Sequence, residues 1–454
     1  MKVATFQQRV AGAALTGLLI TTLTASGSAR GAQDTPATET TDNAPNAPTA
    51  KNVQARQADA TRADAGPTAS HGPGDMFRYG EFHGSLRTLY YSTHNAYFVP
   101  DNNQDTISYG GSLGFESARW QGFRFGISAI VQRGIDHPDD AHAVSELEPD
   151  ETNIGEAYVS WQHGDFGLTA GNQRMQLPFA SDYDWRVTPM LYQGFNLHYG
   201  DDEDFLQAAR IYRYKSWGSD TFSRTTNYTD VEEETDGMWA VGAGHAWYAD
   251  GQKWSGQLWH ERYDDYVRIS YAEGHVTATQ GALQPLLGVQ YIRGTSDGRA
   301  LAGEVDNHTY GLQLGLRYHS LEATLNMDHI ASSPGDYLNG ALVTPYAHNS
   351  SSGPYFAQPF FTSTQDLGAG NAYSLDVTGA ASEALLVGAR YSFMDLKDEA
   401  GAASLNQSEY LLFGIYSFQG ALEGFSIADY AGVQTSPARA RDFWQNRVAL
   451  QYEF

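Results

Sequence analysis

The chain ends on the stretch Trp444-Gln445-Asn446-Arg447-Val448-Ala449-Leu450-Gln451-Tyr452-Glu453-Phe454. In an extended chain, Trp444 and every second residue after it fall on one face, which is mostly large and apolar. The residues between them are polar or small. This alternation is typical of a β-strand with one face in an apolar environment.

The same pattern recurs upstream in stretches of about ten residues, separated by turn-forming segments. Leu312, Leu314 and Leu316, for example, alternate with Gln313, Gly315 and Arg317. Together with the last one, these stretches predict eighteen strands, near residues 80–91, 106–117, 122–133, 152–163, 165–173, 190–199, 204–215, 238–248, 252–262, 265–273, 282–292, 306–319, 321–330, 371–380, 383–394, 408–418, 422–431 and 442–454.

The connections between these strands differ in length by position. Those after even-numbered strands are mostly short, as at His163–Gly164 and Asp250–Gly251, whereas those after odd-numbered strands are mostly long and polar, as at 331–370. Tyr263–Asp264 breaks the rule, and 274–281 is expected to be an irregular turn. Short turns at one end and long loops at the other are typical of a transmembrane β-barrel. We therefore expect an all-β, closed antiparallel transmembrane β-barrel of 18 strands, with short periplasmic turns and long extracellular loops.

Two other features bear on this fold. Aromatic residues gather at strand ends, as expected of the girdles at membrane interfaces. A large soluble β-sandwich or propeller with an aromatic core is the alternative, but it does not explain the asymmetry of the loops.

The composition excludes several classes of protein. The 454 residues include 28 Lys and Arg against 53 Asp and Glu, and the formal net charge is -25. Such a chain repels nucleic acid, so no nucleic-acid partner is expected. With no Cys, disulfides, thiolate metal sites and Cys nucleophiles are excluded. The mean hydropathy of -0.45 argues against a helical membrane protein.

The N-terminal region divides into two segments. Val10 to Ala25 is an apolar run that follows Lys2 and Arg9 and precedes small residues, so residues 1–29 are predicted to be a secretory signal peptide. Residues 30–76 contain almost no large apolar side chains and are predicted to be a disordered leader. The barrel is then expected over residues 77–454.

A family resemblance enters at residues 152–195. Gly155-Glu156-Ala157-Tyr158 is followed by Gly171-Asn172-Gln173-Arg174, and then by Pro178-Phe179, Asp182, Arg186 and Pro189. This pattern resembles the OprD-type outer-membrane porins. A second stretch, Gly353-Pro354-Tyr355-Phe356 with Gly368-Ala369-Gly370-Asn371, resembles the seventh loop and fourteenth strand of related porins. The leader 30–76 departs from the usual family pattern.

The resemblance implies both a fold and a function. It implies an outer-membrane barrel of eighteen strands whose third extracellular loop, roughly 174–190, folds into the lumen as a constriction. It also implies passive, selective uptake of small solutes, especially organic acids or amino acids that carry a carboxylate, guided by basic side chains along one wall.

The strand alternation itself assigns basic residues to the lumen, because a charge on the lipid face costs about 2–4 kcal/mol at the midplane. Arginine suits a row of weak carboxylate sites, since its planar fork binds carboxylates with two donors. Each arginine could instead pair with a neighbouring carboxylate and only stiffen the wall. The predicted ladder consists of Arg87, Arg124, Arg213, Arg268, Arg317, Arg390 and Arg447.

Four charged residues of the third loop have two possible roles. Arg174, Asp182, Asp184 and Arg186 either line the constriction or tie the loop to the wall. We expect a mixture, with Asp182 and Arg186 as anchors, because a loop inside a water-filled lumen needs tethers.

Acidic residues concentrate in the second and fourth long loops and in the turn 201–204. They are either solvated surface or ligands for divalent cations that bridge lipopolysaccharide phosphates. The loop residues are Asp136, Asp139, Asp140, Glu146, Glu148, Asp150, Glu151, Asp220, Asp230, Glu232, Glu233, Glu234 and Asp236.

Rival functions find less support. Pairs such as His260 and Glu261 lack a nucleophile at a recognisable spacing, so no enzyme, catalytic residue, metal site or cofactor is predicted. The leader is too short and polar for a folded plug. A structural or adhesive barrel acting through its long loops stays open. The expected partners are outer-membrane lipid and lipopolysaccharide, small solutes, and the barrel-assembly machinery, which would recognise the strand that ends at Phe454.

Overall fold

The computed structural model describes residues 72–454 except 136–141, 145, 146, 148, 348–353, 362–367 and 398–405. The predicted signal peptide and nearly all of the predicted leader lie outside the described residues. None of the described helices is long and apolar enough to cross a bilayer.

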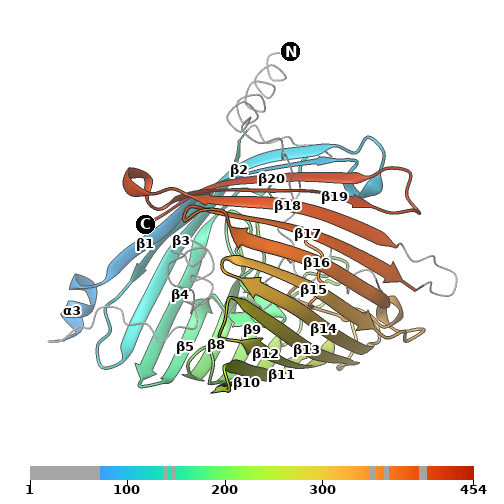
Figure 1. Ribbon diagram of the computed structural model, residues 1–454. Helices are drawn as coiled ribbons and strands as arrows, with labels where there is room; N and C mark the ends of the chain where they lie inside the picture. Colours follow the sequence, from blue (N-terminus) through green and yellow to red (C-terminus); the bar gives the residue numbers. More distant parts are fainter. Residues whose placement is uncertain are drawn as a thin grey trace, which may run out of the picture.

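The described residues form one antiparallel sheet of 18 strands that closes on itself, because β1 pairs with both β2 and β20 (Figure 1). The last residue takes part in the closure, since the Phe454 N–H donates to the Gly84 carbonyl at 3.1 Å. The closed antiparallel barrel is therefore confirmed. The barrel strands are β1 (Glu81–His94), β2 (Gln104–Glu116), β3 (Phe123–Ile135), β4 (Glu151–His163), β5 (Phe166–Gln173), β8 (Leu191–Gly200), β9 (Phe205–Lys215), β10 (Met238–Ala249), β11 (Gln252–Tyr263), β12 (Val267–Ala278), β13 (Leu283–Ser296), β14 (Asp306–Tyr318), β15 (Leu321–Ile330), β16 (Gly370–Ala380), β17 (Leu385–Leu396), β18 (Gln407–Ser417), β19 (Phe425–Thr435) and β20 (Phe443–Glu453).

Each predicted strand corresponds to one of these, with shifted ends. The largest shift is in β12, which runs to Ala278, so the prediction of an irregular turn over 274–281 was wrong. Residues 274–278 keep the alternation, with His275 and Thr277 facing inward and paired in register with β11 and β13.

The remaining elements are short. A helix, α3 (Pro73–Arg78), precedes β1, and Met76 packs against Ala118. The prediction of disorder was therefore wrong for residues 73–76, because Met76 finds apolar cover at the barrel wall. The 3-10 turns are η2 (Ala96–Phe98), η3 (Tyr337–Asn339) and η5 (Gly420–Leu422).

The two ends of the barrel differ as predicted. At the turn end, short connections such as Asp250–Gly251 join the strands, and at the loop end the connections are long (Figure 1). Two long connections matter below: the third loop (residues 174–190), with the small hairpin β6 (Gln176–Leu177) and β7 (Ala180–Ser181), and the seventh loop (residues 331–369).

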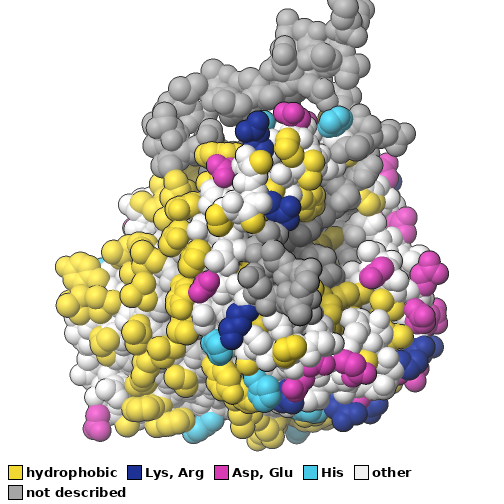
Figure 2. Space-filling view, turned by 90° about the vertical axis from the view of Figure 1, so that its right-hand side faces the viewer, with side chains coloured by type: hydrophobic (Ala, Val, Ile, Leu, Met, Phe, Trp, Pro, Cys, Tyr) yellow, Lys and Arg dark blue, Asp and Glu magenta, His cyan; other side chains and the backbone are white. Residues whose placement is uncertain are grey.

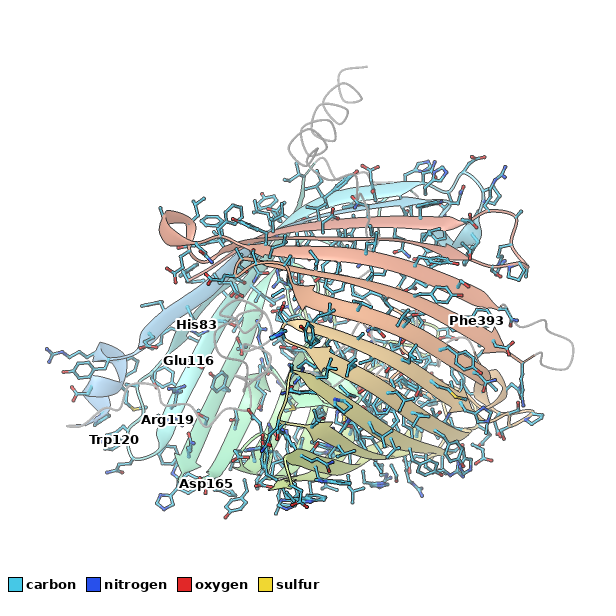
Figure 3. The ribbon with its side chains drawn as sticks, in the orientation of Figure 1. His83, Glu116, Arg119, Trp120, Asp165 and Phe393 are labelled. Atoms are coloured by element: carbon cyan, nitrogen blue, oxygen red, sulfur yellow. The ribbon has the colours of Figure 1, made fainter. Side chains whose placement is uncertain are left out.

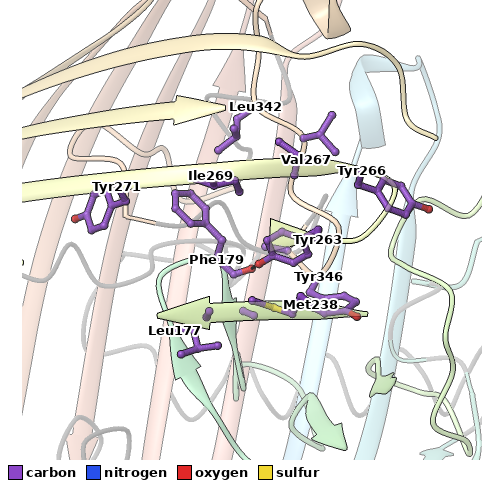
Figure 4. Packing of buried hydrophobic residues seen from close by; sticks show 14 of the residues in the cluster. Leu177, Phe179, Met238, Tyr263, Tyr266, Val267, Ile269, Tyr271, Leu342 and Tyr346 are labelled. Atoms are coloured by element: carbon purple, nitrogen blue, oxygen red, sulfur yellow. Dashed lines mark hydrogen bonds between the residues drawn. The ribbon is translucent and has the colours of Figure 1, made fainter. Parts of the chain in front are cut away.

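The third loop and the described part of the seventh loop fold into the barrel and build an apolar core there. Leu177 and Phe179 of the third loop and Leu342 and Tyr346 of the seventh pack together against inward side chains of β9 to β13 (Figure 4). Gly294 on β13 makes room for this contact, because a Cβ there would lie 2.5 Å from Leu342 Cδ1. The lumen is thus filled on the β9 to β13 side.

Candidate functional site

The open part of the lumen is a cavity of about 680 Å³ on the side opposite this core. It is lined by the third loop and by strands that include β1 to β5, β19 and β20. Five arginines contribute to the lining: Arg87, Arg119, Arg124, Arg174 and Arg447. The cavity reaches the turn end, where His83, Glu116, Arg119 and Asp165 lie (Figure 3).

Three predicted ladder residues belong to this lining, and each is largely buried. The Arg124 guanidinium lies 2.9 Å from the Glu116 carboxylate. Arg87 donates to Gln451 at 2.7 Å and to the Asp184 carboxylate at 2.8 Å. Arg447 stacks on the Tyr91 ring, with its guanidinium carbon 3.6 Å from the ring centroid.

Two more ladder residues face inward but do not line the cavity. Arg317 pairs with Glu322 at 2.6 Å. Arg390 pairs with Asp376 and donates to the Gln358 carbonyl of the seventh loop at 2.7 Å. Arg317 and Arg390, like Arg87 and Arg124, therefore each pair with a carboxylate, which was the alternative to a free carboxylate-binding site.

The predicted inward orientation of Arg268 was wrong. On β12, Val267, Ile269 and Tyr271 face inward and are buried in the apolar core, so Arg268 faces outward and is half-exposed. The prediction assumed that every inward face meets water. Here that face meets the third and seventh loops, and the apolar residues take the inner side of the wall.

The predicted inward orientation of Arg213 was also wrong, for a different reason. A β-bulge shifts the register between β8 and β9, so that Gly194 pairs with Ile211 and Gln193 with Arg213. Because an extra residue reverses the alternation beyond it, Arg213 turns outward and is exposed, while Tyr214 turns inward.

Three charged residues of the third loop, Arg174, Asp182 and Asp184, belong to one ion-pair cluster. Arg174 Nη1 lies 2.9 Å from the Asp184 carboxylate and 3.3 Å from that of Asp182, and Arg87 binds Asp184 from the wall. Asp182 also accepts from the Gln176 amide at 2.8 Å. Arg174, at 26% exposure, is the most accessible cation of the cluster.

The two aspartates titrate in opposite directions. Burial raises the pKa of Asp182 to about 6, although Arg174 favours its charged form. Burial also disfavours the charged form of Asp184, but Arg87 and Arg174 outweigh it and hold the pKa of Asp184 well below its usual range. Protonation of Asp182 is therefore the accessible change of charge at the constriction.

Arg186 occupies a different position. It is fully buried, its guanidinium lies over the Trp217 ring at 4.5 Å and the Tyr91 ring at 5.4 Å, and it donates to the Tyr91 hydroxyl at 3.2 Å. Its carbonyl accepts from Arg87. This geometry is that of an anchor between the third loop and the wall.

The seventh loop is held by wall residues that the sequence reasoning missed. The Asp328 carboxylate accepts from the Ala357 N–H at 2.6 Å, and Glu409 accepts from the N–H groups of Phe360 and Phe361. Gln290 donates to the Pro354 carbonyl at 2.5 Å. Asp328 on β15 and Glu409 on β18 stand at inward positions of the strand alternation. An acidic residue at an inward position was the only sign in the sequence that could have identified them.

The described residues do not support a cation site in the acidic loops or a catalytic pair at His260 and Glu261. Asp136, Asp139, Asp140, Glu146 and Glu148 lie outside them. No group of three or more His, Asp or Glu that could hold a metal ion occurs among the residues that are described. His260 and Glu261, considered as a catalytic pair, point to opposite faces of β11, because Glu261 is buried inside and His260 is exposed outside.

A comparison with known protein families finds a match. The model of the outer membrane porin, OprD family, matches residues 153–454. No curated relative matches the chain by sequence.

Solved structures share the fold at low identity. Pseudomonas aeruginosa OpdO is 18% identical, with a TM-score of 0.69 over 85% of this chain and 99% of that one. A BenF-like porin from Pseudomonas fluorescens Pf-5 is 14% identical, with a TM-score of 0.71 over 83% and 99%. Pseudomonas aeruginosa OpdK, solved with vanillate, is 16% identical, with a TM-score of 0.67 over 83% and 99%.

The family match covers more than half of the chain, and the closed barrel of 18 strands carries a third loop folded into its lumen. This chain belongs to the OprD family of outer-membrane porins.

Proposed function

We propose that the protein is a channel, not an enzyme, through which small solutes carrying a carboxylate diffuse passively across the outer membrane. The observation that carries the proposal is the 680 Å³ cavity beside the third loop, where Arg87, Arg124, Arg174 and Arg447 line one continuous space. In this water-filled passage, a carboxylate meets several weak cationic sites in succession.

The charge pattern explains why these sites would bind weakly. Arg124 and Arg87 each have a carboxylate partner within 3 Å, so an incoming carboxylate exchanges one partner for another. Arg174, at 26% exposure, is more exposed than Arg87 and Arg124, and it lies in the third loop beside Asp182 and Asp184. Repeated weak sites favour passage over retention.

The vanillate complex of OpdK adds support, because vanillate itself carries a carboxylate. The adhesive alternative, in contrast, depends on long loops that project outward. The described part of the seventh loop is largely buried inside the barrel, with Tyr355 and Phe356 fully covered.

Two further assignments go with this function. We propose that residues 1–29 direct export and are removed, and that the assembly machinery recognises the last strand, whose final residue completes the barrel by pairing with Gly84.

Planar-bilayer recording tests the proposal. The purified protein should give stepwise openings, and benzoate should change the current more than benzyl alcohol at the same concentration. An electrically silent protein, or equal effects of the two solutes, would overturn it.

A further inference from the structure

A row of outward-facing residues crosses β9 to β12 near the loop end. The register pairs Arg210 with Trp239, Trp239 with Arg262, and Arg262 with Arg268. Because residues in register project from the same face of a sheet, three guanidinium groups and one indole stand together on the outside of the barrel. At about 4.8 Å between strands, the row from Arg210 to Arg268 spans roughly 14 Å. We name Arg210, Arg262 and Arg268 the outer arginine row.

The carboxylates that accompany this row lie beneath it. The Nε atoms of Arg262 and Arg268 lie 3.2 and 2.6 Å from Asp297, which is 1% exposed, whereas the arginines are 51% and 52% exposed. Asp264, at 17% exposure, accepts from Arg210 and pairs with Arg262, both at 3.3 Å. Three cations therefore share two largely buried carboxylates. Arg210 is itself only 7% exposed, so the accessible positive charge of the cluster is that of Arg262 and Arg268.

Arg210 is held rigidly in this arrangement. Its guanidinium lies 4.9 Å from the centroids of both the Tyr212 and Trp239 rings, and it donates to the Asp236 carbonyl at 2.5 Å. Stacking between two rings fixes the plane of this buried guanidinium, and the shared carboxylate of Asp264 keeps its charge next to Arg262.

The outer arginine row lies at the height where the barrel wall meets the lipid head groups. Trp239 and Tyr212 are half-exposed aromatic side chains of the kind that mark a membrane interface, so the row lies at the level of lipid head groups. In the view onto the loop end, Lys and Arg side chains stand beside acidic ones along the lower edge of the rim (Figure 2). The chain as a whole carries a net charge of -25, so an outward positive surface here runs against the overall balance.

Like charges directly opposite each other in a sheet are destabilising, and Arg262 and Arg268 are such a pair. Asp297 pairs with both arginines and Asp264 with Arg262, and these carboxylates are far less exposed than the two arginines. We propose that phosphate groups of lipopolysaccharide in the outer leaflet bind from outside to the two exposed members of the outer arginine row, Arg262 and Arg268. Phosphate accepts the two-donor fork of arginine, and a basic surface at head-group level attracts anionic lipid.

The decisive variant is Arg262→Gln/Arg268→Gln, with binding of fluorescent lipopolysaccharide measured in detergent. We expect about fivefold weaker binding for each guanidinium lost, and so roughly thirtyfold for the double variant. The heat-induced shift of the folded band on a gel shows whether the variant barrel is intact. The variant Arg262→Lys/Arg268→Lys keeps the charge and loses the two-donor fork. Its affinity for lipopolysaccharide should lie between those of the parent and the double Gln variant.

Arg133→Gln is the matched control, because Arg133 on β3 also faces outward at the loop end and pairs with an acid, Asp150. It should bind as the parent does. Enzymatically dephosphorylated lipopolysaccharide should bind weakly to the parent, and inorganic phosphate should not compete at the same molar concentration. Unchanged binding by the double variant, an equal loss in Arg133→Gln, or equal binding of the dephosphorylated lipid would overturn the proposal.

Discussion

Arg87 on β1 lies 2.8 Å from the Asp184 carboxylate of the third loop, so a direct ion pair joins the barrel wall to the constriction. Arg87 also donates to the Asp184 carbonyl at 3.2 Å and to the Arg186 carbonyl. This wall residue therefore holds the third loop at two of its residues, Asp184 and Arg186.

The first prediction concerns this tether. Arg87→Gln removes the cation and leaves Asp184 with Arg174 alone, and breaking a largely buried pair costs about 3–5 kcal/mol. The third loop should then sample more than one position, and single-channel recording should show several conductance levels where the parent shows one main level. Arg317→Gln is the control, because Arg317 is also an inward arginine, and its carboxylate partner, Glu322, lies on the neighbouring wall strand. A single unchanged level in Arg87→Gln would contradict this role.

The second prediction concerns pH. Above pH 7 the charges of Arg87, Arg174, Asp182 and Asp184 cancel, and as the pH falls through about 6 Asp182 takes up a proton and the cluster gains one positive charge. Anion preference should rise on acidification by about fivefold at most, since a unit charge at 4 Å in water is worth about 1 kcal/mol. Reversal potentials in a salt gradient at pH 5 and pH 8 measure the change.

The variant Asp182→Asn should show the low-pH preference at both pH values. A pH-dependent reversal potential in this variant would assign the titration to another group. The same shift affects stability: because folding raises the pKa of Asp182, its ionisation favours the unfolded state, and its contribution to stability decreases as the pH rises from about 4 to 6.

The third prediction concerns the seventh loop. Glu409→Ala removes the acceptor of the Phe360 and Phe361 N–H groups, and each buried donor left without a partner costs about 1–3 kcal/mol. The loop should leave the wall, and the mean conductance should rise. Glu322→Ala removes another inward carboxylate, which pairs with Arg317 on the neighbouring strand, and should keep the parent conductance. If both variants conduct alike, Glu409 does not hold the loop.

The sequence was sufficient for the fold because alternation is a local property of each strand. Every second residue of β20 faces lipid as expected, and the short and long connections correctly assigned the two ends of the barrel. The third loop was found through the family pattern around Arg174 and Asp182, not through periodicity.

The orientation of individual arginines was less predictable, because it depends on contacts made far along the chain. Arg268 faces outward because the inner side of β12 is covered by the third loop and by the described part of the seventh loop. Arg213 faces outward because one bulge reverses the phase of β9. Nothing in the local sequence of either strand distinguishes an inner face that meets water from one that meets a folded loop.

The fourth prediction concerns Arg186, which lies fully buried between the Tyr91 and Trp217 rings. Arg186→Lys keeps the positive charge but loses the planar group that stacks on both rings, and a lysine that is buried this deeply is costly to keep charged. We expect a loss of about 2–4 kcal/mol, since a desolvated cation–π contact contributes about 2 kcal/mol or more and two rings are involved. The temperature at which the barrel unfolds on a gel should fall for this variant and stay unchanged for Arg133→Lys, whose side chain is exposed at the rim. Equal unfolding temperatures in the two variants would show that Arg186 holds the third loop by its charge alone, and the planar stacking would then have no part in fixing the constriction.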